Sequence, residues 1–243
     1  MLSKNQAKLI RSLEQKKNRE REGLFVAEGP KVVGDLLQAG YTARLIVDDE
    51  TEVRKVSFLQ HPQGVLGVFE IPRHDTLTTE ELRAMLSREL LLALDGIQDP
   101  GNLGTIIRIA DWFGITTLLC SRQTADAYNP KVVQATMGSL ARVRVVYTEL
   151  AETLRAINRP DTEAIPIYGT LLDGEDLYQQ SLTPNGLIVM GNEGNGITPE
   201  IKTMVNRKLR IPNFNPQPTA ADSLNVAIAT AITCSEFRRR QHP

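Results

Sequence analysis

The chain has 243 residues, and its 28 lysines and arginines nearly balance its 29 aspartates and glutamates, giving a formal charge of −1. With 41% hydrophobic and 23% charged residues, the composition is that of a folded chain of one large or two small domains. This balance excludes a uniformly basic, histone-like nucleic-acid binder, although it allows a local basic patch. No apolar run is long enough to span a membrane, and we expect a cytoplasmic protein.

Cysteine and histidine usage narrows the chemistry. Cys120 and Cys234 lie in apolar or small-residue stretches and form no CxxC pair, so we expect neither a zinc cluster nor a disulfide scaffold. The three histidines are scattered, without a Ser-His-Asp or histidine–metal pattern. We therefore expect no metal, and a chemistry that depends on neither histidine nor cysteine.

The first 22 residues carry seven lysines and arginines against three glutamates. A partial helical stripe runs through them, made of Leu2, Leu9, Ile10 and Leu13. Their charge is typical of a solvated helix, or alternatively of an arm that contacts phosphates. A small α/β module follows, with strands expected over 24–29, 43–49 and 63–72 and a helix over 30–40.

Segment 76–88 predicts a further helix, capped by Thr78 or Thr79. We place the domain boundary in this segment, so that residues 1–85 form the first domain and residues 86–243 the second.

The second part alternates strands and helices regularly. Strands are expected over 89–97, 115–121, 142–147, 164–169, 186–191 and 208–213. Helices are expected over 105–114, 130–139, 149–157, 198–206 and 223–240. This alternation predicts a mostly parallel sheet covered by helices, and the continuous apolar run 89–97 indicates a strand buried on both faces.

Ligands of open parallel sheets bind beyond the carboxyl ends of the strands, and three such ends are rich in glycine and polar groups. The first is 97–108, where Asn102 is expected to cap the next helix. Arg108 lies one turn into that helix, on the same face as the turn. A capped turn with an exposed arginine is an equally good interpretation of this segment alone.

The second end is 189–198, where Gly191, Gly194 and Gly196 follow an apolar strand. The spacing is neither the Rossmann fingerprint nor a P-loop, so a tight turn is the alternative to a ligand loop that contains Glu193. The third end is 210–232, a proline-rich loop before a helix that Asp222 or Ser223 is expected to cap.

Together and in this order, the three segments resemble the SpoU (TrmH-like) branch of the SPOUT RNA methyltransferases. Residues 102–108 match N-x-G-x-x-x-R, residues 189–197 match a strand leading into G-N-E-G-x-G, and residues 211–212 with 223–226 match I-P…S-L-N-V. The resemblance covers about residues 89–240. Residues 17–29 look like part of the small, L30e-like substrate-binding domain that often precedes this catalytic domain.

The resemblance implies an α/β fold with a SPOUT-type parallel sheet and a C-terminal deep trefoil knot, preceded by a small L30e-like RNA-binding domain. It implies methyl transfer from S-adenosylmethionine to a ribose 2′-hydroxyl of tRNA or ribosomal RNA, by a homodimer that shares its active site. The implied donor-binding residues are Thr170, Gly191, Ile211 and Leu224. The implied catalytic residues are Asn102, Arg108, Glu193, Ser223 and Asn225.

The role of Arg108, the effect of one loop and the function itself each keep an alternative. Arg108 is either the base that activates the hydroxyl or, because a free arginine is not easily a base, a phosphate clamp that stabilises the developing alkoxide. The loop 213–222 is longer than in many family members and lacks their glycine, so donor binding or specificity can differ. A non-catalytic RNA-binding or ribosome-assembly protein with this fold is the alternative function. An unrelated nucleotide-binding enzyme is disfavoured by the missing phosphate-binding motifs.

Overall fold

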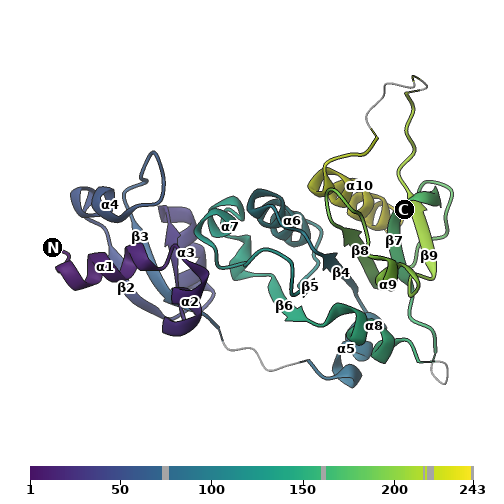
Figure 1. The fold of residues 1–243 in the computed structure, drawn as a ribbon, viewed down its shortest axis with the longest axis horizontal. Helices are drawn as coiled ribbons and strands as arrows, with labels where there is room; N and C mark the ends of the chain where they lie inside the picture. The colour runs from purple at the N-terminus through teal and green to yellow at the C-terminus, as the bar shows by residue number, and fades with distance from the viewer. Residues whose placement is uncertain (73–76, 160–162, 216, 218–221, 242–243) are drawn as a thin grey trace.

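The computed structural model describes residues 1–72, 77–159, 163–215, 217 and 222–241. These residues form two α/β parts that lie side by side along the long axis of the molecule, with the N-terminal part on the left of Figure 1. Among them, no helix combines the length and apolarity that crossing a bilayer requires.

The N-terminal part is a three-stranded antiparallel sheet in the order β1-β3-β2. Its strands are β1 (Leu24–Glu28), β2 (Ala43–Val47) and β3 (Leu66–Glu70). Its helices are α1 (Lys4–Ser12), α2 (Lys16–Glu22), α3 (Pro30–Gln38) and α4 (Glu50–Val56). The three strands and the helix after β1 confirm the prediction, whereas α4 was missed because its only apolar residues are Val53 and Val56.

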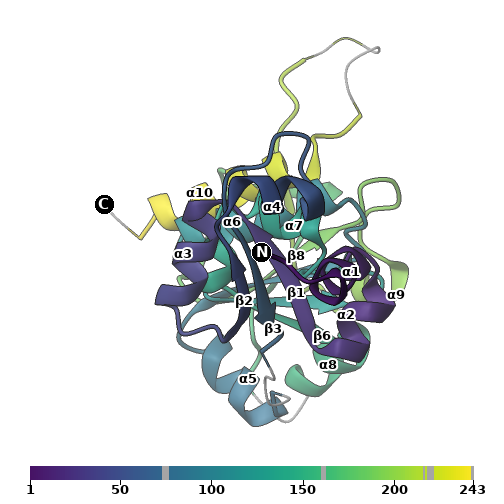
Figure 2. The same ribbon diagram turned by 90° about the vertical axis from the view of Figure 1, so that its left-hand side faces the viewer.

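Both faces of this small sheet are covered, with α3 on one side and α1 and α2 on the other in the end-on view of Figure 2. Along β1, Leu24 and Val26 pack in one cluster with Ile10 of α1. Phe25 and Ala27 point to the opposite face and join a larger core that extends into the second part. This alternation follows from the two-residue period of a strand.

The second part is a six-stranded, all-parallel sheet in the order β6-β5-β4-β8-β7-β9. The strands are β4 (Leu90–Asp95), β5 (Thr117–Ser121), β6 (Arg144–Thr148), β7 (Ile167–Asp176), β8 (Gly186–Gly191) and β9 (Arg207–Arg210). The helices are α5 (Thr79–Leu86), α6 (Pro100–Trp112), α7 (Pro130–Ala135), the short 3-10 turn η1 (Ser139–Ala141), α8 (Leu150–Ile157), α9 (Pro199–Lys202) and α10 (Val226–Arg239). The predicted parallel α/β sheet is confirmed.

The central strand β4 shows why its apolar run is continuous. Leu90, Leu92 and Leu94 pack with α6, α7 and α10 on one face, and Leu91 and Ala93 pack with α5, α8 and α9 on the other. Helix α5 is capped by Thr78 with a reciprocal bond from Glu81, and it buries its apolar side in this second core. A strand covered on both faces has no position at which a polar residue is favoured.

The strand order reverses its direction between β4 and β8. From β4 the chain runs outward through β5 to β6, and it then returns to the other side of β4 through β7 and β8. The two strands pair in register up to their last residues, Asp95 and Gly191. Such a switch point leaves a crevice at the carboxyl ends of the strands, where open sheets bind their ligands.

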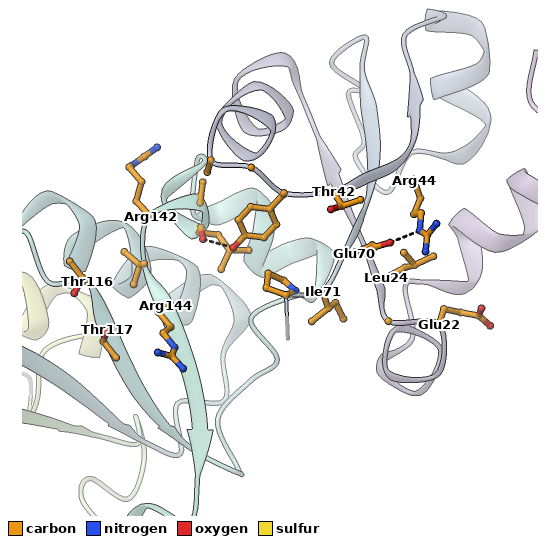
Figure 3. Close-up of a pocket in the computed structure, with 18 of the residues that line it drawn as sticks. Glu22, Leu24, Thr42, Arg44, Glu70, Ile71, Thr116, Thr117, Arg142 and Arg144 are labelled. Atoms are coloured by element: carbon orange, nitrogen blue, oxygen red, sulfur yellow. Dashed lines mark hydrogen bonds and ion pairs between the residues drawn. The ribbon is translucent and has the colours of Figure 1, made fainter. Parts of the chain in front are cut away.

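The two parts share a continuous core. The rings of Phe25 and Tyr128 lie 4.9 Å apart, and the Tyr41 hydroxyl donates to the Leu140 carbonyl at 3.1 Å. Beside this contact, at the amino ends of β5 and β6, lies a cleft of about 1160 Å³. Figure 3 shows its walls, with Arg44 and Glu70 on one side and Thr116, Thr117, Arg142 and Arg144 on the other.

Candidate active site

The first site segment begins helix α6 earlier than predicted. Asp99 is the N-cap, and its Oδ1 accepts from the backbone N–H of Asn102 at 2.7 Å. The prediction that Asn102 caps this helix is therefore wrong, because the helix begins at Pro100, one residue after Asp99. The Asn102 side chain is left available for contacts with other loops.

The third segment also starts its helix at a different residue. Asn225 caps α10, and its Oδ1 accepts from the N–H groups of Ala227 at 2.9 Å and Ile228 at 3.3 Å. The expectation that Asp222 or Ser223 caps this helix is wrong, since α10 begins at Val226. Because the Asn225 side-chain oxygen is bonded to the helix N–H groups, its NH2 group can donate to another loop.

The second segment is a tight loop closed on itself. The backbones of Asn192 and Gly196 pair, and the Asn192 side chain accepts from Gly194 N–H and donates to the Gly96 carbonyl at 2.6 Å. Gly191 is required here, because a Cβ on it would lie 2.2 Å from the backbone of Gly196. These contacts present Glu193 at the carboxyl end of β8.

A chain of side-chain hydrogen bonds joins the three segments. Asn225 Nδ2 donates to Asn102 Oδ1 at 2.9 Å, and Asn102 Nδ2 donates to Glu193 Oε1 at 2.9 Å. These residues lie 123 and 91 positions apart along the sequence. The fold thus brings three of the five predicted catalytic residues into one network, next to the switch point.

Arg108 and Ser223 lie outside this network. Arg108 is exposed on α6 and makes no hydrogen bond or ion pair with the residues that the structure describes. It shares an exposed stripe with Thr105 and with Trp112, which is 85% exposed. Ser223 is exposed as well, and it lines the neighbouring pocket.

That pocket brings all four predicted donor-binding residues together. It encloses about 800 Å³, and its lining includes Thr170, Gly191, Ile211 and Leu224. Its volume lies within the range of about 300–1,000 Å³ that is usual for small-molecule sites. Met190 and Val226 add apolar surface, while the 191–196 loop adds backbone polar groups. This mixture fits a nucleoside joined to an amino acid. Of loop 213–222, residues 216 and 218–221 lie outside the described residues.

Neither cysteine is a candidate nucleophile. Cys120 and Cys234 are both free and fully buried, and burial raises the pKa of the Cys234 thiol to about 12. Burial raises the pKa of Cys120 as well. In the described part of the chain, no three histidine, cysteine, aspartate or glutamate residues group as metal ligands would.

Sequence reasoning missed two residues that build the site. Asn192 closes the second loop and ties it to Gly96, and Asp99 caps α6. Both lie inside the segments 97–108 and 189–198 that the sequence singles out, but only their side-chain contacts show what they do. An asparagine directly after the strand-ending glycine was the available signal, because asparagine side chains readily bond nearby backbone groups in turns.

Comparison with known proteins supplies the family. The model of the SpoU rRNA Methylase family matches residues 89–235, and that of the MRM3-like substrate binding domain matches residues 4–52. The chain belongs to the SpoU rRNA methylase family. It is a methyltransferase with S-adenosylmethionine as its cofactor, and it acts on RNA, which confirms the prediction.

Similar proteins cover nearly the whole chain. The 23S rRNA (guanosine(2553)-2′-O)-methyltransferase RlmP of Bacillus subtilis is 30% identical over 97% of both chains. A Porphyromonas gingivalis protein assigned to the TrmH family of RNA methyltransferases is 39% identical, with 99% of both chains covered and a TM-score of 0.85. An AdoMet-bound rRNA methyltransferase from Sinorhizobium meliloti is 30% identical, covering 100% of this chain and 97% of its own, with a TM-score of 0.85.

Proposed function

We propose that this SpoU-family protein methylates a ribose 2′-hydroxyl of large-subunit ribosomal RNA. The observation that carries the proposal is the hydrogen-bonded chain Asn225–Asn102–Glu193 beside a pocket that suits S-adenosylmethionine. The similarity to the 23S rRNA 2′-O-methyltransferase of Bacillus subtilis, which extends over both parts of the chain, supports ribosomal RNA as the substrate. The knot expected around the pocket stays a prediction.

The protein's own residues would position the reactants. When bound, the donor supplies an electrophilic methyl group, so no metal or thiol is needed. Thr170, Gly191, Ile211 and Leu224 would hold it, and the asparagine–glutamate chain would keep the surrounding loops in one geometry. In-line transfer depends on such alignment, which can supply much of the acceleration.

Arg108 would clamp an RNA phosphate and stabilise the oxyanion that develops on the ribose oxygen. A guanidinium keeps its proton at neutral pH and is a poor base, whereas its planar fork suits a phosphate. Ser223, at the mouth of the pocket, would contact the substrate.

Substrate RNA would also bind the N-terminal part. We propose that this part ends between β3 and α5, ahead of the boundary after residue 85 that the sequence predicts, since α5 packs in the second core. Lys4, Lys8 and Lys17 are exposed there, and each makes no ion pair with the described residues. They are suited to contact phosphates. A cytoplasmic location remains the expectation from the sequence.

We also propose that the active site is shared in a homodimer. The exposed stripe of α6 carries Arg108 and Trp112, and α10, which packs beside α6, exposes 52% of Ile228. Adjoining apolar side chains at this exposure are typical of an interaction surface. A second copy seated there would bring Arg108 of one protomer to the pocket of its partner.

The test is methyl transfer from labelled S-adenosylmethionine to unmodified large-subunit rRNA. Wild type is expected to transfer, and Arg108→Ala to lose about 10³-fold in kcat while its donor Kd is unchanged. Arg108→Ala mixed with Asn225→Ala is expected to regain activity, because in a shared site one intact centre forms per mixed dimer. Donor binding without transfer to any RNA would instead favour the non-catalytic RNA-binding protein, and no regain on mixing would contradict the shared site.

A further inference from the structure

Arg19 is a fully buried cation in a segment whose other lysines and arginines are exposed. Its side chain is 2% exposed, although it lies on α2 between Lys16 and Arg21, which face solvent. Burying a charge is expensive unless it is paired and fully hydrogen-bonded. A buried arginine therefore points to a specific task other than the phosphate contact suggested by the charge of residues 1–22.

The partners of Arg19 come from both parts of the molecule. Its Nη1 donates to the carbonyls of Leu13 and Glu14, each at 2.7 Å, just beyond the end of α1. Its Nε and Nη2 donate to Oδ2 of Asp126 at 3.0 and 2.5 Å. Asp126 belongs to the loop after β5 in the catalytic part, 107 residues away. One guanidinium thus joins α1, α2 and a catalytic-domain loop.

The Asp126 loop is bonded in turn to the end of β4 and to the loop that follows it. Ala125 N–H donates to the Ile97 carbonyl at 2.8 Å, and Thr124 Oγ1 donates to the Leu94 carbonyl at 3.1 Å. The Gly96 carbonyl in this same stretch accepts from Asn192 Nδ2 at 2.6 Å, and Asn192 lies in the 191–196 loop that carries Glu193. The contact between the two parts at Arg19 is therefore continuous with the backbone that carries Asn102 and Glu193.

We propose that Arg19 is a positioning residue for methyl transfer, which holds the N-terminal part at the angle that delivers bound RNA to the catalytic loops. The inference rests on the proposed function, because it assumes that the N-terminal part binds the substrate. A guanidinium suits this task because its five donors point in fixed directions. An apolar contact of similar area has no such directionality.

The experiment separates positioning from stability. Arg19→Met leaves the Asp126 carboxylate unpaired in a largely buried site, and we expect a fall in Tm of about 10 °C. Replacing both partners, by Arg19→Met with Asp126→Leu, removes the unpaired charge and is expected to restore most of the Tm, since apolar pairs often replace buried ion pairs without loss. The restoration is incomplete, because the Leu13 and Glu14 carbonyls and the Tyr128 N–H each lose a hydrogen-bond partner. Positioning predicts that the double variant still has its kcat reduced tenfold or more, because a misplacement of about 1 Å can cost 10²-fold. Its Kd values for rRNA and S-adenosylmethionine are expected to match wild type.

Two matched controls sharpen the result. Arg21→Met removes an exposed arginine from the same helix, and Tyr41→Phe removes a different hydrogen bond between the two parts, to Leu140. Both are expected to keep kcat within about twofold of wild type. Arg19→Lys is expected to regain part of the loss, since an ammonium group reaches fewer of these partners.

A readout independent of activity is the distance between spin labels at Lys8→Cys and Glu152→Cys. Both positions are exposed and lie in different parts, and the native cysteines are buried. The distance distribution is expected to broaden in the double variant. Recovery of kcat together with Tm would make Arg19 a stabilising residue only, and a weakened rRNA Kd would make it an RNA contact; either result overturns the proposal. If wild type transfers no methyl group to rRNA, the proposed function fails instead.

Discussion

The two ends of the parallel sheet each carry a cavity, and only one of the two cavities lies at the candidate active site. The larger hollow, about 1160 Å³, lies at the amino ends of β5 and β6 and contains none of the predicted site residues. The smaller, about 800 Å³, lies at the carboxyl ends of β7 and β8 and contains six of them. Topology rather than volume therefore marks the site, because only the carboxyl ends meet at a switch point of the strand order.

The polar contacts at the two ends differ in the same way. At the amino ends, Arg44 pairs with Glu70, and Arg142 pairs with Asp35 and Asp111; the two arginine side chains are 66% and 47% exposed, and such surface pairs contribute little to stability. At the carboxyl ends, amide and carboxylate side chains join loops that are far apart in sequence. Both ends therefore hold contacts between segments far apart in sequence, but only those at the carboxyl ends join predicted catalytic residues.

The largest effect that would break this contrast is expected from Asn102→Ala. The substitution removes both the oxygen that accepts from Asn225 and the N–H group that donates to Glu193. The three loops then lose the side chain that links them. We expect kcat for methyl transfer to fall about 10²-fold, as misplacement at a reacting centre does, with Tm within a few degrees of wild type. Arg44→Gln at the opposite end is the control and should retain wild-type kcat. Equal losses from both variants would remove the distinction.

Much of this site could be predicted from the sequence, because its residues lie in motifs at the ends of apolar strands. The sequence could not predict which residue caps each helix. Asn102 and Asp99 are both good caps, and the choice depends on which of them Glu193 and Asn225 need as a partner in the folded chain. The task of Arg19 was equally hidden, since local charge gives no sign of a partner 107 residues away.

A smaller effect, on stability rather than rate, is expected at Glu236 of α10. Its carboxylate accepts from Arg239 and Arg240, and Arg240 also donates to the Tyr178 carbonyl after β7. These hydrogen bonds, led by that from Arg239, lower the pKa of Glu236 from 4.5 to about 2. We expect Glu236→Gln to cost about 2 kcal/mol at pH 7, measured by urea unfolding.

The pH dependence of this cost follows from the direction of the shift. A carboxylate with a lowered pKa in the folded state contributes its full stability above pH 4.5 and loses it as the pH falls toward 2. The difference between wild type and Glu236→Gln should therefore shrink between pH 5 and about pH 2. Glu152→Gln, an exposed glutamate on α8, is the control and should show no such trend. A difference that stays constant with pH would contradict the assignment.

The smallest effect is expected from the exposed lysines of the N-terminal part, and it tests whether this part binds RNA by charge. Lys4, Lys8 and Lys17 are exposed, and none forms an ion pair with the described residues. Each phosphate contact steepens the fall of log Kobs with log salt by about 0.7 to 0.9. Replacing all three by glutamine should therefore reduce the slope for rRNA binding by about 2, with kcat at saturating RNA unchanged. Lys55→Gln, whose lysine is already paired with Glu52, should leave the slope as it is. An unchanged slope in the triple variant would place the RNA on another face of the molecule, because exposed cations that release no counterions do not contact phosphates.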